Sequence, residues 1–123
     1  MRKVRITSGG TALTATLRDT PTADAVWAAL PFESSARTWG EEAYFMVPVS
    51  AALEPDAKDV VAPGEIAFWA DGSAIAVGYG RTPASRGDEI RLVSPTNIFA
   101  DADGDVRVMR AVRDGDPVKV ERA

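Results

Sequence analysis

Apolar and polar residues alternate along most of the chain, and this period of two predicts β-strands rather than helices. The alternation is clearest in residues 3–7 and 11–17, which flank a Ser-Gly-Gly turn and therefore predict a β-hairpin. Asp71–Gly72 is typical of a two-residue turn and predicts a second hairpin. Six further segments are predicted as strands: 34–39, 42–49, 64–70, 73–80, 95–100 and 117–122.

One segment has the period of an α-helix instead. Thr20 suits the N-cap of this helix and Pro21 its first helical position. Pro31 disfavours helical geometry in the residue before it, so we expect a helix over residues 21–30. Residues 105–112 fit a strand or a short second helix equally well. The apolar stripe of the first helix, spaced i, i+3, i+4 and i+7, consists of Ala23, Val26, Trp27 and Leu30.

Short strands separated by Gly and Pro predict a mainly β protein, either a closed barrel or a sandwich. A parallel α/β fold is disfavoured because no helices recur between the strands. The length of 123 residues suits a single domain spanning residues 1–123.

Composition and charge exclude several classes of function. The chain has no Cys and no His, so disulfides, thiol nucleophiles, Ser–His–Asp triads and the usual transition-metal ligands are absent. A net charge of −4 without a basic run argues against nucleic-acid binding. Residues 101–108 start like a calcium loop, but Val112 stands where an EF-hand needs Glu. We expect no metal and no cofactor.

No stretch of apolar residues approaches the ~20 that a membrane helix needs, and no signal peptide is visible behind the charged N-terminus. We therefore expect a cytoplasmic protein with no membrane partner.

Three segments resemble a family of small bacterial and archaeal cyclophilin-like proteins, most of them uncharacterised. The segments are residues 31–49 (PFESSARTWGEEAYFMVPV), 63–85 (PGEIAFWADGSAIAVGYGRTPAS) and 94–99 (SPTNIF). The resemblance implies a closed eight-stranded β-barrel with a helix over one end. True cyclophilins are prolyl isomerases, and they hold the proline substrate with an essential Arg together with aromatic, Gln and His side chains. The resemblance therefore also implies this activity as a hypothesis to test here. This chain has no Gln and no His, and Arg37 is the candidate for the Arg.

Glu41 and Glu42 form the most conspicuous pair of candidate catalytic groups. Adjacent residues of a strand point to opposite faces, so the two carboxylates cannot meet as an acid/base dyad if both lie in extended chain. Phe45, Val47 and Val49 share the phase expected for the barrel interior. Glu41 has this phase too, at the strand end, whereas the outward phase contains Glu42, Tyr44 and Met46.

Tyr44 and Met46 would form an exposed apolar patch on the outer face of the barrel, and such patches mark binding surfaces. Each aromatic has an alternative role as ordinary core. The long connection over residues 80–95 is either a solvated loop or a binding loop, in which Arg81, Arg86 and Arg91 would hold an anionic ligand. The predicted ligand-binding residues are Trp39, Tyr44, Met46, Trp69, Tyr79 and Arg81.

Three hypotheses of function follow. The first is a domain that binds a small molecule or a proline-containing peptide on the outer face. The second is a divergent prolyl isomerase with Arg37 or Arg81 as the donor to the amide. The third is a carboxylate-dependent lyase or hydrolase with Glu41 or Glu42 as the base. The same exposed patch would also serve a homo-oligomer.

Overall fold

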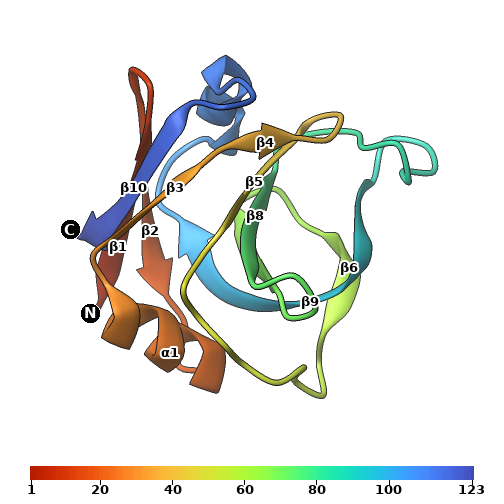
Figure 1. Cartoon of the computed structure of the whole chain (residues 1–123). Helices are drawn as coiled ribbons and strands as arrows, with labels where there is room; N and C mark the ends of the chain where they lie inside the picture. The colour runs from red at the N-terminus through yellow and green to blue at the C-terminus, as the bar shows by residue number, and fades with distance from the viewer.

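The computed structural model describes residues 1–123 and contains ten strands, one α-helix and one 3-10 helix (Figure 1). The helices are α1 (Pro21–Ala29) and η1 (Val106–Ala111). The strands are β1 (Lys3–Ser8), β2 (Thr11–Leu17), β3 (Phe32–Ser35), β4 (Arg37–Thr38), β5 (Glu42–Met46), β6 (Lys58–Val61), β7 (Glu65–Trp69), β8 (Ala74–Gly78), β9 (Ile90–Ala102) and β10 (Pro117–Arg122). Neither helix is both long and apolar enough to cross a membrane.

The strands form a nearly closed antiparallel barrel, as predicted. Hydrogen bonds connect them in the order β3-β10-β1-β2-β9-β7-β8-β5-β4, and β6 pairs with β9 off this path. The two ends of the path, β3 and β4, are consecutive parts of one extended segment that is interrupted at Ala36. The wall therefore returns to its starting segment, which confirms the mainly β barrel expected from the sequence.

The two helices lie at opposite ends of the barrel (Figure 1). The Thr20 hydroxyl accepts a 3.1 Å hydrogen bond from the backbone N–H of Ala23, which caps α1 as predicted. The helix ends at Ala29, with Leu30 as its C-cap, one residue earlier than expected. The ambiguous segment 105–112 forms a helix, because the Asp105 carboxylate accepts from the backbone N–H of Arg107 and caps η1.

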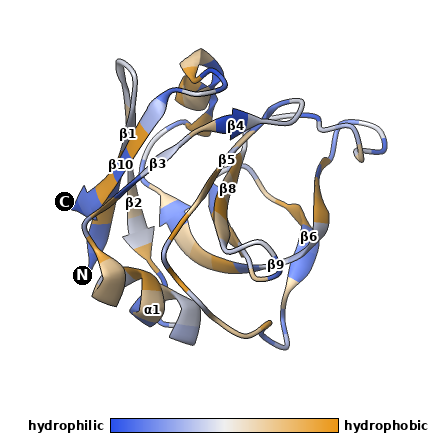
Figure 2. Cartoon of the chain, viewed as in Figure 1, coloured by the Kyte–Doolittle hydropathy of each residue, from blue (hydrophilic) through white to orange (hydrophobic).

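The main core fills the barrel and receives side chains from opposite walls and from both helices. Phe45, Val47 and Val49 belong to this cluster, which confirms the predicted interior phase, although β5 itself ends at Met46. Figure 2 shows apolar residues along the middle of β9 and hydrophilic residues at its end. The largest fully buried side chains are Phe45, Phe68, Phe99, Ile6, Ile66, Ile75 and Met109.

A second, smaller core lies on the outer face of β7 and β8. Alternate residues of these strands divide between the two cores: Ile75 and Val77 point inward, whereas Ala76 belongs to the outer cluster. The outer cluster is covered by β6 and the start of β9 and contains Val61, Ala67, Ala76, Ile90, Leu92 and Ile98. Both faces of this wall are therefore packed with apolar side chains.

Two predictions about this region were wrong. The segment 80–95 is not wholly a loop, because β9 begins at Ile90 and pairs with β6, a strand that the sequence analysis did not predict. The turn after β7 has four residues, 70–73, rather than two, since Trp69 pairs with Ala74. Ser73, with a φ of 49°, adopts the left-handed conformation in this turn.

Candidate functional site

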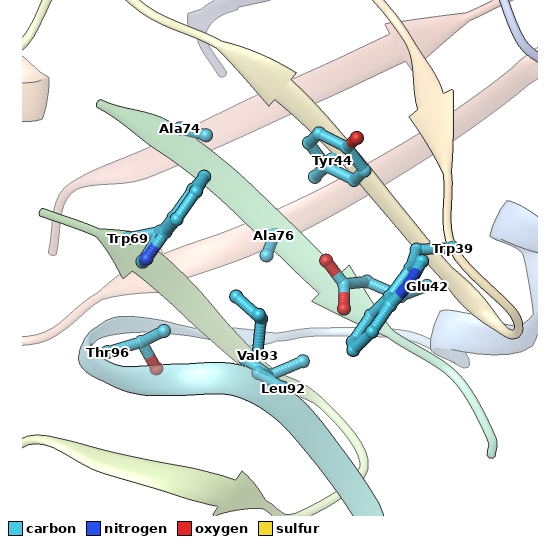
Figure 3. A pocket seen from close by; sticks show the side chains of 9 residues that line it. All are labelled: Trp39, Glu42, Tyr44, Trp69, Ala74, Ala76, Leu92, Val93 and Thr96. Carbon is cyan, nitrogen blue, oxygen red and sulfur yellow. The ribbon is translucent and has the colours of Figure 1, made fainter. Parts of the chain in front are cut away.

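A pocket of about 210 Å³ opens on the outer face of the barrel, between β5, β7 and β8 on one side and the first half of β9 on the other (Figure 3). Seven of its nine lining residues are hydrophobic. The lining residues are Trp39, Glu42, Tyr44, Trp69, Ala74, Ala76, Leu92, Val93 and Thr96.

Strand alternation explains how the pocket is built. Glu42 and Tyr44 point outward from β5, while Ala43 and Phe45 between and beyond them pack inside the barrel. The neighbouring strand β8 presents only methyl groups to the outside, from Ala74 and Ala76. Small side chains flanked by large aromatic ones leave a hollow.

The indole of Trp69 forms one wall and is held from two directions. Its Nε1 donates a 2.8 Å hydrogen bond to the hydroxyl of Ser94 on β9. Its six-membered ring lies against Gly72, where an added Cβ would be only 2.3 Å from Cζ3. Gly72 is thus required for the position of the ring, a role different from the hairpin turn expected of it.

Trp39 stands on the opposite side, in the turn between β4 and β5 (Figure 3). Gly40 follows it with a φ of 60°, and a Cβ there would lie 2.9 Å from the carbonyl oxygen of Arg81. The backbone N–H of Trp39 donates a 3.0 Å hydrogen bond to the backbone carbonyl of Glu42, which closes the turn. Glycine therefore permits both the left-handed backbone and the close approach that place Trp39 over the pocket.

Glu42 is the one carboxylic acid in the lining. Only 6% of the residue is exposed, and its Oε1 has no hydrogen-bond partner. Figure 3 shows its carboxylate directed into the space between Trp39 and Ala76. Burial raises the pKa of Glu42 to about 7, because removing a carboxylate from water disfavours its charged form.

Glu41 has a different environment and does not join Glu42. Its Oε1 accepts a 3.3 Å hydrogen bond from the backbone N–H of Arg81, and its Oε2 lies 3.9 Å from the Arg110 guanidinium at the end of η1. Its side chain is 46% exposed. The two carboxylates therefore do not meet, although β5 begins only at Glu42 and the extended chain assumed for both residues does not include Glu41. The pocket contains a single carboxyl group.

Of the six residues proposed for ligand binding, the pocket brings together Trp39, Tyr44 and Trp69. Met46 faces outward but is 55% exposed outside the pocket. Tyr79 packs against the barrel core. The sequence contained this signal, because Tyr79 is spaced by two residues from Val77 and by four from Ile75 and so shares their inward phase.

The arginines considered in the sequence do not surround the pocket. Arg37 on β4 and Arg81 are exposed and are not among the lining residues, and neither is Arg86. Arg91 forms ion pairs with Glu89 and with Asp59, the latter at 3.0 Å. The arginines of the segment 80–95 therefore do not form an anion site at this pocket, although Leu92 and Val93 of the same segment line it.

Five lining residues were missed by the sequence analysis. Ala74 and Ala76 carried a usable signal, since they alternate with large inward residues in the strand 73–80. Leu92 and Val93 lie in the part of β9 that was predicted as the connection 80–95. Thr96 lies at the start of the predicted strand 95–100.

Comparison with known proteins places this architecture in a family. Residues 2–121 match the family described as Cyclophilin-like. The chain belongs to the Cyclophilin-like family. The cyclophilin-like chain is also similar to the hypothetical protein AF2241 from Archaeoglobus fulgidus, whose solution structure has a TM-score of 0.86 with it. The two share 35% identity over 99% of this chain and 95% of that one.

A more distant likeness links the cyclophilin-like barrel to McbB, whose structure was determined in complex with tryptophan. The TM-score is 0.69 and the identity 16%, over 97% of this chain and 44% of that one, so the likeness concerns the fold alone. A search of curated proteins gave no match.

Proposed function

We propose that this cyclophilin-like protein binds a small molecule in the outer-face pocket. The observation that carries the proposal is the unpartnered carboxyl oxygen of Glu42 inside an aromatic cavity. Buried polar atoms in folded proteins nearly always have a hydrogen-bond partner. A ligand with a suitable polar group would supply the partner that the chain lacks.

The composition of the pocket suits ligand binding. Binding sites for small molecules are concave and mostly apolar, with a few polar groups that fix the orientation of the ligand. Trp39, Tyr44 and Trp69 provide the large apolar surfaces, and Glu42 provides the polar group. A cavity of about 150 Å³ holds benzene, so the 210 Å³ here suits a single substituted ring or the end of a longer molecule.

A prolyl isomerase needs a donor that weakens the resonance of the amide beside the proline. Neither Arg37 nor Arg81 lines the pocket. The geometry therefore favours a binding protein over the isomerase among the hypotheses drawn from the sequence.

A fragment screen by ¹H–¹⁵N correlation NMR tests the proposal. We expect fragments of one ring to shift the amide signals of residues 42–44, 69–76 and 92–96. Ala76→Leu fills the hollow and should abolish these shifts, whereas Ala28→Leu, on the exposed face of α1, should leave them unchanged. Fragments that bind only elsewhere, or that bind the Ala76→Leu variant equally well, would refute the proposal.

Glu42 also supports a second candidate function, a hydrolase in which this carboxylate acts as general base. A base is most effective when its pKa is near the working pH, and the pKa of Glu42 is about 7. Hydrolysis of 4-nitrophenyl acetate above background should then rise with pH and level off above pH 7. The rate should vanish in Glu42→Gln and persist in Glu41→Gln. Equal rates in the two variants would eliminate this candidate.

A further inference from the structure

We infer that the pocket recognises a small organic cation, an amine whose ammonium group pairs with Glu42 and whose apolar body contacts the aromatic walls. This inference rests on the proposed binding function and specifies the chemical class of the ligand. It depends on three properties of the pocket: an unpaired carboxyl group, the absence of any cationic side chain beside it, and the aromatic faces around it.

The carboxyl group has no counter-ion in the protein. Tyr44 is the only other titratable side chain in the lining, and β7, β8 and β9 contribute no charged residue to it. The single arginine of β9, Arg91, is engaged by Glu89 and Asp59. Burial is the cause of the raised pKa of Glu42, and no neighbouring positive charge offsets it. A cation that enters the pocket therefore meets a negative group that nothing else neutralises.

An ammonium group meets both requirements of Glu42 at once. Its N–H groups donate to the unpaired Oε1, and its positive charge stabilises the ionised carboxylate. A neutral alcohol supplies a donor without the charge. A carboxylate ligand supplies neither and is repelled.

The aromatic residues strengthen the preference for a cation. The faces of Trp and Tyr rings attract positive charge, and they do so more strongly when water is excluded. Figure 3 shows Trp39 beside the Glu42 carboxylate, with Tyr44 and Trp69 on the other sides of the same space. The chain already uses this interaction elsewhere, since the Arg122 guanidinium lies 4.3 Å from the centre of the Trp27 ring.

The pH dependence distinguishes a cation from a neutral ligand. The carboxyl group of the free protein loses its proton near pH 7, whereas an alkylammonium ion keeps its proton to about pH 9 or above. Binding of the cation requires the ionised form, so its affinity should rise as the pH rises from 5.5 to 8. A neutral ligand that accepts a hydrogen bond from protonated Glu42 should show the opposite trend.

Three probes of similar size test the inference by NMR titration: benzylamine, benzyl alcohol and benzoate. We expect benzylamine to bind at pH 8 about tenfold more tightly than benzyl alcohol, the ratio that one well-placed charge interaction supplies. Its affinity should fall by about thirtyfold at pH 5.5, as Glu42 becomes protonated. Benzoate should not bind.

Glu42→Gln keeps the shape of the side chain and should remove the preference for benzylamine and its pH dependence. Glu41→Gln is the matched control and should keep both, because Glu41 lies outside the pocket. The pH dependence in the unmodified protein needs no variant and remains informative if one folds poorly.

Equal binding of benzylamine and benzyl alcohol, with shifts at the pocket residues, would refute the cation inference and leave the binding function standing. Absence of binding by all three probes at millimolar concentration would overturn both.

Discussion

The indole Nε1 of Trp69 on β7 donates a hydrogen bond to the hydroxyl of Ser94 on β9, over 2.8 Å. This bond joins the barrel wall to the strand that forms the other side of the pocket. It also fixes the indole of Trp69, one aromatic wall of the pocket, in one orientation. The pocket is therefore organised in part by Ser94, a residue that does not line it.

Removal of the Ser94 hydroxyl should loosen this wall. We expect Ser94→Ala to lower the free energy of unfolding by about 1 kcal/mol, the usual contribution of one hydrogen bond. The mobility of the indole should increase and the affinity of pocket ligands should decrease. Urea denaturation and tryptophan fluorescence anisotropy measure the two effects. Ser50→Ala, at an exposed position, is the control and should change neither.

Gly72 is predicted to be intolerant of any side chain. In Gly72→Ala the new Cβ would overlap the Trp69 ring, so the ring or the turn must move, at a cost of about 1–3 kcal/mol. Near-ultraviolet circular dichroism should report the displaced indole, and thermal denaturation the loss of stability. The control is Gly104→Ala, where a Cβ would meet nothing within 4 Å. Equal effects at the two glycines would show that the Trp69 contact is unimportant.

Glu42 should make the stability of the protein depend on pH. Its pKa rises from 4.5 in the unfolded chain to about 7 in the folded protein, so the folded state holds the proton more tightly. The resulting stabilisation is complete below pH 4.5 and is lost as the pH rises through 7. The pKa difference corresponds to roughly 2–4 kcal/mol.

Glu42→Gln tests this dependence, because glutamine cannot ionise. Relative to the unmodified protein, the variant should gain stability by roughly 2–4 kcal/mol when urea denaturation at pH 8 is compared with pH 5. Glu41→Gln should show no such gain. A constant difference between the Glu42 variant and the unmodified protein at both pH values would contradict the raised pKa.

Asn97 joins three parts of the chain at the base of the barrel and should be important for stability. Its Nδ2 donates to the Thr22 hydroxyl of α1 and to the Ala52 carbonyl, while its Oδ1 accepts from the Glu54 N–H. Asn97→Ala removes these bonds in a site that is 1% exposed and should cost about 2–4 kcal/mol. The urea midpoint measures the loss. Asp88→Ala, in the exposed loop before β9, should be neutral.

The elements with strong local signals were predictable from the sequence. Residues 11–17 and 117–122 form strands with the predicted bounds, because alternation along each matches burial on one face. The Thr20–Pro21 start of α1 was equally clear, since capping and proline geometry are local properties.

The region over the pocket was not predictable by the same means. β6 is four residues long and has one fully buried position, Val61, so its sequence shows little alternation. The start of β9 follows a segment rich in Gly, Pro and Ser, and Pro95 lies within the strand. Pairing between β6 and β9 is a tertiary event, and no local pattern indicates it.

The lining of the pocket was predicted only in part, because local patterns indicate which strand residues face outward but not which distant strands cover them. The outward phase of β5 predicted Glu42 and Tyr44, and the outer aromatic of β7 predicted Trp69, and all three line the pocket. Charge was the misleading signal, since the arginines near residues 81–91 suggested an anionic ligand. Glu42 is buried, and an unpaired buried carboxylate favours a cationic ligand instead. Its burial depends on strands distant in the sequence and could therefore not be predicted from local patterns.

The division of β7 and β8 between two cores has an evolutionary consequence. Inward side chains such as Ile75 and Val77 are constrained by the barrel, whereas Ala74 and Ala76 on the same strand face the pocket. Substitutions at the outward positions can change the size and chemistry of the cavity without disturbing the packing inside. One scaffold can in this way carry cavities of different size and chemistry while it keeps the same architecture.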